Sequence, residues 1–114
     1  MLLVFYNLLY CTQRTCARHV LIARALHAGC QGSLINQGGL LHTSNANTTS
    51  GRTHVPVKTS TDAGATWSQG SLVWAGPSGY SQLVSLGDPK SVGILLEAGR
   101  KSTYETISFA VVTL

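Results

Sequence analysis

Few residues of this chain combine a type and a spacing that could support catalysis or metal binding. The carboxylates are two aspartates and two glutamates: Asp62, Asp88, Glu97 and Glu105. The four histidines lack the spacing of metal ligands and have no carboxylate close to them in sequence: His19, His27, His42 and His54. We therefore expect neither a metal nor a cofactor, and any chemistry must depend on single side chains that the fold brings together.

Two other side chains can act on a charged substrate. Arg52 has a permanently charged, planar guanidinium, which can hold a carboxylate through two parallel hydrogen bonds. Tyr80 has a phenol, which becomes a nucleophile only when a nearby base takes its proton. Each also has an ordinary interpretation, Arg52 as a surface residue beside a polar loop and Tyr80 as a half-buried strand residue.

The composition is that of a small folded protein. A chain of 114 residues can form one domain with a modest core, and 44% apolar with 11% charged residues argue against disorder. The formal net charge is +4, but the lysines and arginines are scattered and never form a run. We therefore expect no nucleic-acid partner.

The three cysteines, Cys11, Cys16 and Cys30, all lie in the first third of the chain. Their odd number, and a Cys-x4-Cys spacing without a matching second pair, indicate neither a disulfide framework nor a metal site. We expect Cys30 to be a small buried residue.

Two features bear on cellular location. Residues 1–10 are mostly apolar, but no basic residue precedes them, and a bilayer span takes roughly 20 apolar residues. Asn47 begins an Asn-Thr-Thr tripeptide that would accept an N-linked glycan if the chain entered the secretory pathway. Both features are compatible with a secretory route.

The chain divides into two parts near residue 29. Residues 1–28 are apolar with cysteines and scattered arginines, and within them residues 17–27 fit either a short helix or a poorly patterned strand. From residue 29 onward, short apolar runs alternate with Gly, Ser, Asn and Pro, which predicts an all-β fold. The expected strands are 31–36, 40–44, 53–59, 72–75, 80–86, 92–97 and 104–112.

Three details of this pattern are specific enough to check. Residues 76–79, Gly-Pro-Ser-Gly, predict a loop. Pro56 predicts an edge strand or an irregularity, because proline cannot donate to a strand ladder. In the last strand Ile107, Phe109 and Val111 alternate, which places them on one face.

An eight-residue run, STDAGATW at residues 60–67, predicts a tight turn. Asp62 can accept hydrogen bonds from the backbone ahead of it, and Gly64 can adopt a positive φ without strain. Trp67 then provides a large apolar ring to anchor the turn against the sheet. The run is similar to the Asp-box of sialidases and some other β-propellers, whose pattern it matches at Ser60, Asp62, Gly64, Thr66 and Trp67.

Residues 29–114 resemble the C-terminal part of an exo-α-sialidase (neuraminidase). Besides the Asp-box, with Arg52 upstream of it, three segments match that family in order: GCQGSLI at 29–35, GPSGYSQL at 76–83, and GILLEAG at 93–99 with YETISF at 104–109. The second of these is similar to a loop of the lysosomal type. The resemblance implies a six-bladed β-propeller, of which this chain would hold about two blades, too few to close a ring.

The resemblance also implies roles for three residues. Tyr80 would be the nucleophile, because the carboxylate on the anomeric carbon of sialic acid repels an anionic nucleophile but not a phenol. Arg52 would be the third arginine of the triad that holds the substrate carboxylate, and Glu97 would position the first. Two positions depart from the family: Gln82 replaces a frequent aspartate, and Leu96 replaces a tyrosine.

Several parts of a sialidase site have no counterpart in this sequence. Missing are the first arginine in its Arg-Ile-Pro strand, the acid/base aspartate, the glutamate that activates the tyrosine, and the second arginine. Arg14, Arg18 and Arg24 lie upstream, but their surroundings do not match the second-arginine motif. Without the general base Tyr80 would be a poor nucleophile, so we expect little or no turnover from the isolated chain.

The leading hypothesis is a C-terminal piece of an enzyme that removes terminal α-linked sialic acid, with retention, from glycoproteins, oligosaccharides and gangliosides. Its partners would be sialylated glycoconjugates, with membrane contact only through gangliosides. Whether it needs a protective partner protein stays open. The expected location is the lysosome or secretory pathway, with the cytoplasm or a membrane surface as the alternative. Two other hypotheses stay open: a non-catalytic propeller fragment that binds glycan or protein, and a free-standing two-sheet domain, against which open sheet edges argue.

Overall fold

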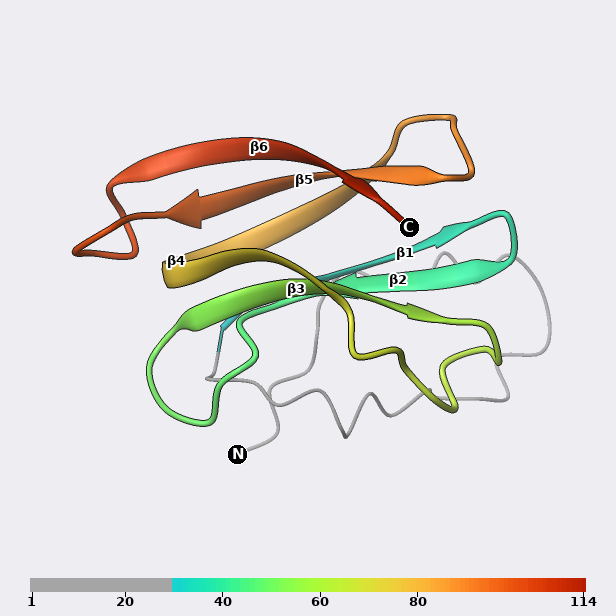
Figure 1. Ribbon diagram of the computed structural model, residues 1–114, viewed down its shortest axis with the longest axis horizontal. Helices are drawn as coiled ribbons and strands as arrows, with labels where there is room; N and C mark the ends of the chain where they lie inside the picture. The colour runs from blue at the N-terminus through green and yellow to red at the C-terminus, as the bar shows by residue number, and fades with distance from the viewer. Residues whose placement is uncertain (1–29) are drawn as a thin grey trace, which may run out of the picture.

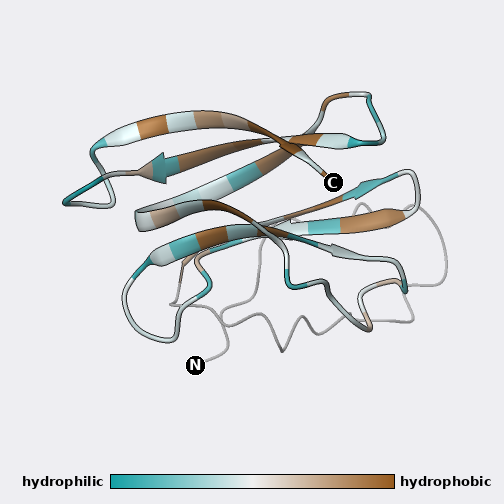
Figure 2. Cartoon of the chain, in the orientation of Figure 1, coloured by the Kyte–Doolittle hydropathy of each residue, from teal (hydrophilic) through white to brown (hydrophobic). Residues whose placement is uncertain are grey.

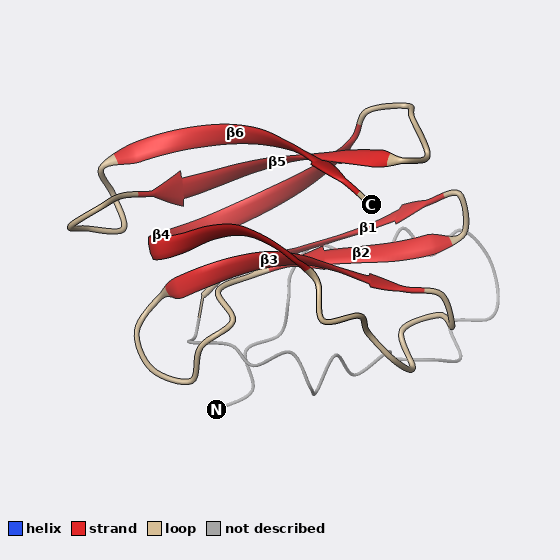
Figure 3. Ribbon diagram, viewed as in Figure 1, coloured by secondary structure: helices blue, strands red, loops and turns tan. Residues whose placement is uncertain are grey.

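The computed structural model describes residues 30–114, and these residues form six β-strands and no helix, as Figure 3 shows. The strands are β1 (Ser33–Gln37), β2 (Leu40–Ser44), β3 (Thr53–Ser60), β4 (Ser71–Ser85), β5 (Ser91–Ala98) and β6 (Thr106–Thr113). Each strand pairs antiparallel with the next, so their order in space is their order in the sequence (Figure 1). The all-β expectation is confirmed, and the described part has no helix that could cross a membrane. The hypotheses for residues 1–28 lie outside the described residues.

The long strand β4 connects two layers of sheet. Its residues 71–77 pair with β3, and its residues 78–85 pair with β5. In Figure 1 the lower layer contains β1, β2 and β3, the upper layer contains β5 and β6, and β4 passes between them. The sheet is therefore curled, and one strand carries the chain from the first layer to the second.

The prediction of a loop at residues 76–79 is wrong, because these residues continue β4. Their Gly-Pro-Ser-Gly composition marks the place where β4 exchanges one partner strand for the other. The Ser78 N–H donates to the Arg52 carbonyl at 2.8 Å, and the Pro77 carbonyl accepts from the Gly99 N–H at 3.0 Å. These hydrogen bonds keep the backbone extended, so two of the seven expected strands join and six are found.

Other boundaries also differ from the prediction. Gln31 precedes β1 and Tyr104 precedes β6, although both were expected within strands. Pro56 lies in β3, which has β2 on one side and β4 on the other, so the edge-strand alternative is wrong. The irregularity is confirmed, because the β3–β4 register shifts between Val55 and Pro56.

The core lies where the layers face each other, and most of it comes from β3 and β5. Its buried apolar residues are Val55, Val57, Leu83, Val92, Ile94, Leu96, Ala98 and Val112. His42 is fully buried in β2, its Nδ1 lies 3.0 Å from Thr59 Oγ1, and burial lowers the pKa of its imidazole. A neutral, packed histidine agrees with its ordinary interpretation, and residues 30–114 contain no cluster of metal-binding side chains.

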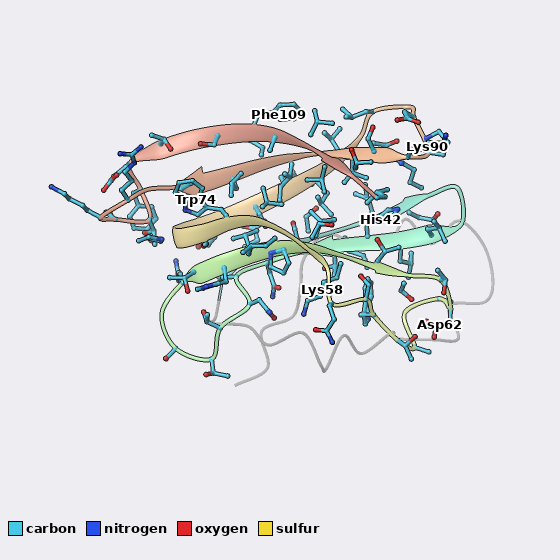
Figure 4. All side chains as sticks on the ribbon, in the orientation of Figure 1. His42, Lys58, Asp62, Trp74, Lys90 and Phe109 are labelled. Atoms are coloured by element: carbon cyan, nitrogen blue, oxygen red, sulfur yellow. The ribbon has the colours of Figure 1, made fainter. Side chains whose placement is uncertain are left out.

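The alternating apolar residues of β6 do share one face, and that face points away from the core. Ile107, Phe109 and Val111 are exposed, while Val112 is buried on the other side of the strand. Register places Phe109 opposite Leu95 of β5, which is exposed as well. Figure 2 shows the apolar positions along β6, and Figure 4 shows Phe109 projecting from the outer side of that strand.

The run at residues 60–67 forms a turn held by two side chains. Asp62 Oδ1 accepts from the Thr66 N–H at 2.8 Å, and its Oδ2 accepts from the Thr66 hydroxyl at 2.6 Å. Ser60 Oγ donates to Asp62 at 2.8 Å and accepts from the N–H of Gly64, whose φ is 90°. Trp67 is half-buried after the turn. The predicted Asp62 acceptor and the positive φ of Gly64 are therefore present.

These hydrogen bonds make the turn sensitive to acid. The hydroxyl and N–H of Thr66, followed by the Ser60 hydroxyl, lower the pKa of Asp62 to about 2. Because the folded pKa lies below the ordinary value of 3.8, the stabilisation is complete above about pH 4 and is lost as pH falls through about 2. We expect the urea midpoint of the wild-type chain to fall more between pH 4 and pH 2 than that of Asp62→Asn. Equal falls in the two chains would contradict this assignment.

Candidate active site

The residues singled out for chemistry come from separate segments of the chain. Arg52 lies just before β3, Tyr80 lies in the second half of β4, and Glu97 is near the end of β5. The crossover of β4 brings these segments together, because Arg52 and Gly99 bond to the neighbouring residues Ser78 and Pro77. The site therefore forms where the two layers separate.

Tyr80 is held by its main chain, and its side chain is available to solvent. Its backbone N–H donates to Glu97 Oε2 at 2.9 Å, and 49% of the residue is exposed. The Arg52 guanidinium carbon lies 5.8 Å from the centre of the Tyr80 ring, which is within cation–π range. A fixed backbone with an exposed phenol beside a cation is suited to contact with an anionic ligand.

Among residues 30–114, no carboxylate or imidazole forms a hydrogen bond with the Tyr80 hydroxyl. Glu97 is the carboxylate that contacts Tyr80, and it accepts from the main-chain N–H. The arginine that Glu97 would position has no counterpart in the described part of the chain, and Arg14, Arg18 and Arg24 lie outside it. The described residues therefore bring a guanidinium and a phenol together, without a hydrogen-bonded base that would activate the phenol.

Arg52 contacts a second aromatic residue. Its Nη1 donates to the Tyr104 hydroxyl at 3.3 Å, and Tyr104 comes from the loop between β5 and β6. The guanidinium of Arg52, which is half-buried, therefore contacts a tyrosine ring in β4 and a tyrosine hydroxyl in this loop. No sequence pattern indicated the second contact, because 52 residues separate Arg52 from Tyr104.

Cys30 lies beneath the site as a neutral thiol. It is buried, as expected, and its Sγ donates to the Gly79 carbonyl at 2.9 Å. Burial raises the pKa of Cys30, nearby Arg52 acts in the opposite direction, and Glu97 adds to the increase. A protonated thiol that donates to the main chain supports the backbone just before Tyr80.

Close packing explains the glycine at position 79. A Cβ there would collide with Glu97 Oε2 and lie 3.1 Å from Glu97 Cβ and Cδ. Any side chain would push Glu97 away from the Tyr80 N–H. Gly79 therefore lets Glu97 bond to the main chain of Tyr80.

The predicted glycosylation residue lies in the loop between β2 and β3. The Asn47 side-chain oxygen accepts from Lys58 Nζ at 3.1 Å, and the Asn47 backbone N–H donates to the His54 carbonyl at 2.8 Å. Asn47 is half-buried in this arrangement. A glycan would attach to Nδ2, the other atom of the same side-chain amide.

Comparison with solved structures identifies the architecture. The chain is similar to a structure described as "Hadza microbial sialidase Hz136", with 36% sequence identity and a TM-score of 0.67. The fold is sialidase-like. The similarity covers 77% of this chain and 18% of that one, so this chain spans only a small part of the length of its sialidase neighbour. No protein-family model and no curated protein sequence matches.

The similarity to a sialidase structure explains the curled sheet. Six antiparallel strands with a crossover in β4 are part of a β-propeller, in which blades of antiparallel strands surround an axis. The expected fold class, about two blades of an incomplete ring, is therefore confirmed. The neighbour is a microbial sialidase, and the comparison supports the sialidase-like fold without supporting the lysosomal type.

Proposed function

We propose that this chain carries part of the active site of an exo-α-sialidase and contributes a carboxylate-binding arginine, Arg52, and a tyrosine nucleophile, Tyr80. The observation that supports this proposal is the meeting of Arg52, Tyr80 and Glu97 from three separate segments. Arg52 would hold the carboxylate of sialic acid. Tyr80 would attack the anomeric carbon once a base supplied by the rest of a complete enzyme takes its proton. Glu97 fixes the backbone of Tyr80 and would also position another arginine.

The substrates proposed for the complete enzyme are terminal α-linked sialosides of glycoproteins, oligosaccharides and gangliosides, cleaved with retention of configuration. A lysosomal or secretory location is part of the same proposal, and it rests on residues 76–83 and the Asn47 sequon. The turn at residues 60–67 would serve as a structural Asp-box. Metals and cofactors have no role in this scheme.

The carboxylate-binding role can be tested on the 114-residue chain by titrating it with N-acetylneuraminic acid and following backbone amide NMR signals. We expect weak binding that Arg52→Met reduces about tenfold or more, because a charge-assisted hydrogen bond contributes about 1.5–3 kcal/mol. The methyl ester of the same sugar, which has no negative charge, should bind the wild-type chain as weakly as the acid binds Arg52→Met.

Lys90→Met is the matched control for lost charge. Lys90 lies in the loop between β4 and β5, at the opposite end of the molecule in Figure 4 from Trp74, whose Nε1 donates to the Pro77 carbonyl beside the site. It should bind the acid as the wild-type chain does. Equal binding of acid and ester, or equal loss in the two methionine variants, would contradict the proposal.

A second candidate is a non-catalytic propeller fragment that binds glycan or protein. The absence of a base beside the Tyr80 hydroxyl within residues 30–114 favours this candidate for the isolated chain. It predicts that Arg52 and Tyr80 are both dispensable for binding. Retained affinity in Arg52→Met together with Tyr80→Phe would therefore favour it over the sialidase site.

A further inference from the structure

The loop between β5 and β6 is built around one carboxylate. Glu105 accepts hydrogen bonds from the backbone N–H groups of Arg100, Lys101 and Ser102, at 3.0, 2.8 and 2.8 Å. These three bonds, the first two foremost, hold the pKa of Glu105 below its ordinary value. A carboxylate with three N–H partners fixes an exposed loop that has no strand pairing of its own.

This loop presents Tyr104 to Arg52. Tyr104 directly precedes Glu105, and its own N–H contacts the Ser102 hydroxyl at 3.4 Å. At the other end of the loop, a Cβ on Gly99 would collide with the Ser102 carbonyl oxygen and lie 3.0 Å from Glu105 Cβ and Cδ. The loop is therefore closed tightly on itself, and Tyr104 has a defined place near its β6 end.

The Tyr104 hydroxyl meets the guanidinium at an atom that can set its orientation. A guanidinium is planar, and its N–H donors point in fixed directions, so a hydrogen bond at Nη1 restrains the rotation of the group. The ring of Tyr80 lies 5.8 Å from the same guanidinium carbon. The Tyr80 ring in β4 and the Tyr104 hydroxyl in the β5–β6 loop thus both contact the Arg52 guanidinium.

We infer that Tyr104 is a positioning residue for Arg52: its hydroxyl, held in place by the Glu105-fixed loop, orients the guanidinium beside Tyr80 to receive a carboxylate. The inference rests on the proposed function for the identity of the ligand. Tyr104 is 68% exposed, and within residues 30–114 its hydroxyl bonds to Arg52 and to no other group, so removing the hydroxyl should leave the core intact.

The test uses the 114-residue chain labelled with ¹⁵N-arginine. In the wild type we expect a distinct Arg52 guanidinium signal, assigned by its loss in Arg52→Met, that shows slowed rotation and exchange. Tyr104→Phe keeps the ring and removes the hydroxyl, so this signal should show faster guanidinium rotation and exchange than in the wild type. Affinity for N-acetylneuraminic acid should fall about twofold to tenfold, the loss expected for one ordinary hydrogen bond.

Two further variants distinguish a loss of Arg52 orientation from general disruption of the loop. Thr103→Ala changes the neighbouring residue of the same loop and should leave both readouts at wild-type values. Glu105→Gln weakens the acceptor that fixes the loop and should shift the Arg52 signal in the same direction as Tyr104→Phe. An unchanged Arg52 signal in Tyr104→Phe would overturn the inference.

A failure of the proposed function has a different signature. If the wild-type chain binds the acid no better than its methyl ester, the sialidase site is wrong, and the role of Tyr104 in ligand binding is wrong with it. The guanidinium signal is measured without ligand, so it decides whether Tyr104 orients Arg52 regardless of that result.

Discussion

Replacing Gly99 with alanine is expected to destabilise the chain by about 3 kcal/mol, because the new methyl group collides with backbone. The Cβ would overlap the Ser102 carbonyl oxygen and crowd Glu105. The loop must then open, which breaks hydrogen bonds from N–H groups to the Glu105 carboxylate. The urea midpoint measures this loss.

Gly87→Ala provides the matched control for Gly99→Ala. Gly87 has a positive φ of 79°, but a Cβ there would have no neighbour within 4 Å. Its substitution should cost only backbone strain, about 1–2 kcal/mol. Gly99→Ala should also lose the slowed Arg52 signal, because Tyr104 moves with the loop, whereas Gly87→Ala should retain it. A Gly99→Ala chain as stable as Gly87→Ala would show that the loop adapts without breaking these bonds.

Local patterns were sufficient to predict most of the strands and the turn. The alternation in the last strand and the short apolar runs between Gly-rich breaks predict strands close to those observed. The turn at residues 60–67 depends on hydrogen bonds within a few residues, so Asp62 and Gly64 were identifiable from sequence. Interactions of short range are encoded locally, and they can be predicted without knowledge of the rest of the fold.

The crossover in β4 could not be predicted in the same way. Gly76, Pro77 and Gly79 have the composition of a loop, and only their long-range partners, among them Arg52 and Glu97, keep the segment extended. The contact of Tyr104 with Arg52 likewise depends on a tertiary arrangement. The resemblance to sialidases pointed to Arg52, Tyr80 and Glu97, whereas Tyr104 follows only from the structure.

The isolated chain is expected to self-associate through the outer face of β5 and β6. Leu95, Ile107, Phe109 and Val111 are 46%, 73%, 56% and 60% exposed, and register places them on neighbouring strands. Val84 of β4 extends this face, because it and Phe109 both lie within 3 Å of a Cβ built on Gly93. An apolar face of this kind, beside a β6 edge that no strand of residues 30–114 covers, favours association.

We therefore expect sedimentation velocity to show concentration-dependent oligomers for the wild-type chain and a monomer for Ile107→Lys/Phe109→Lys. Two lysines interrupt the apolar face and add charge beside the open edge, while the buried side of β6 is left unchanged. The charge-matched control is Ser50→Lys/Gln69→Lys, which adds the same charge at exposed loop positions and should still associate. A control as monomeric as the β6 variant would mean that net charge, and not this face, determines association. Loss of association only in the β6 variant would identify this face as the one through which the chain self-associates.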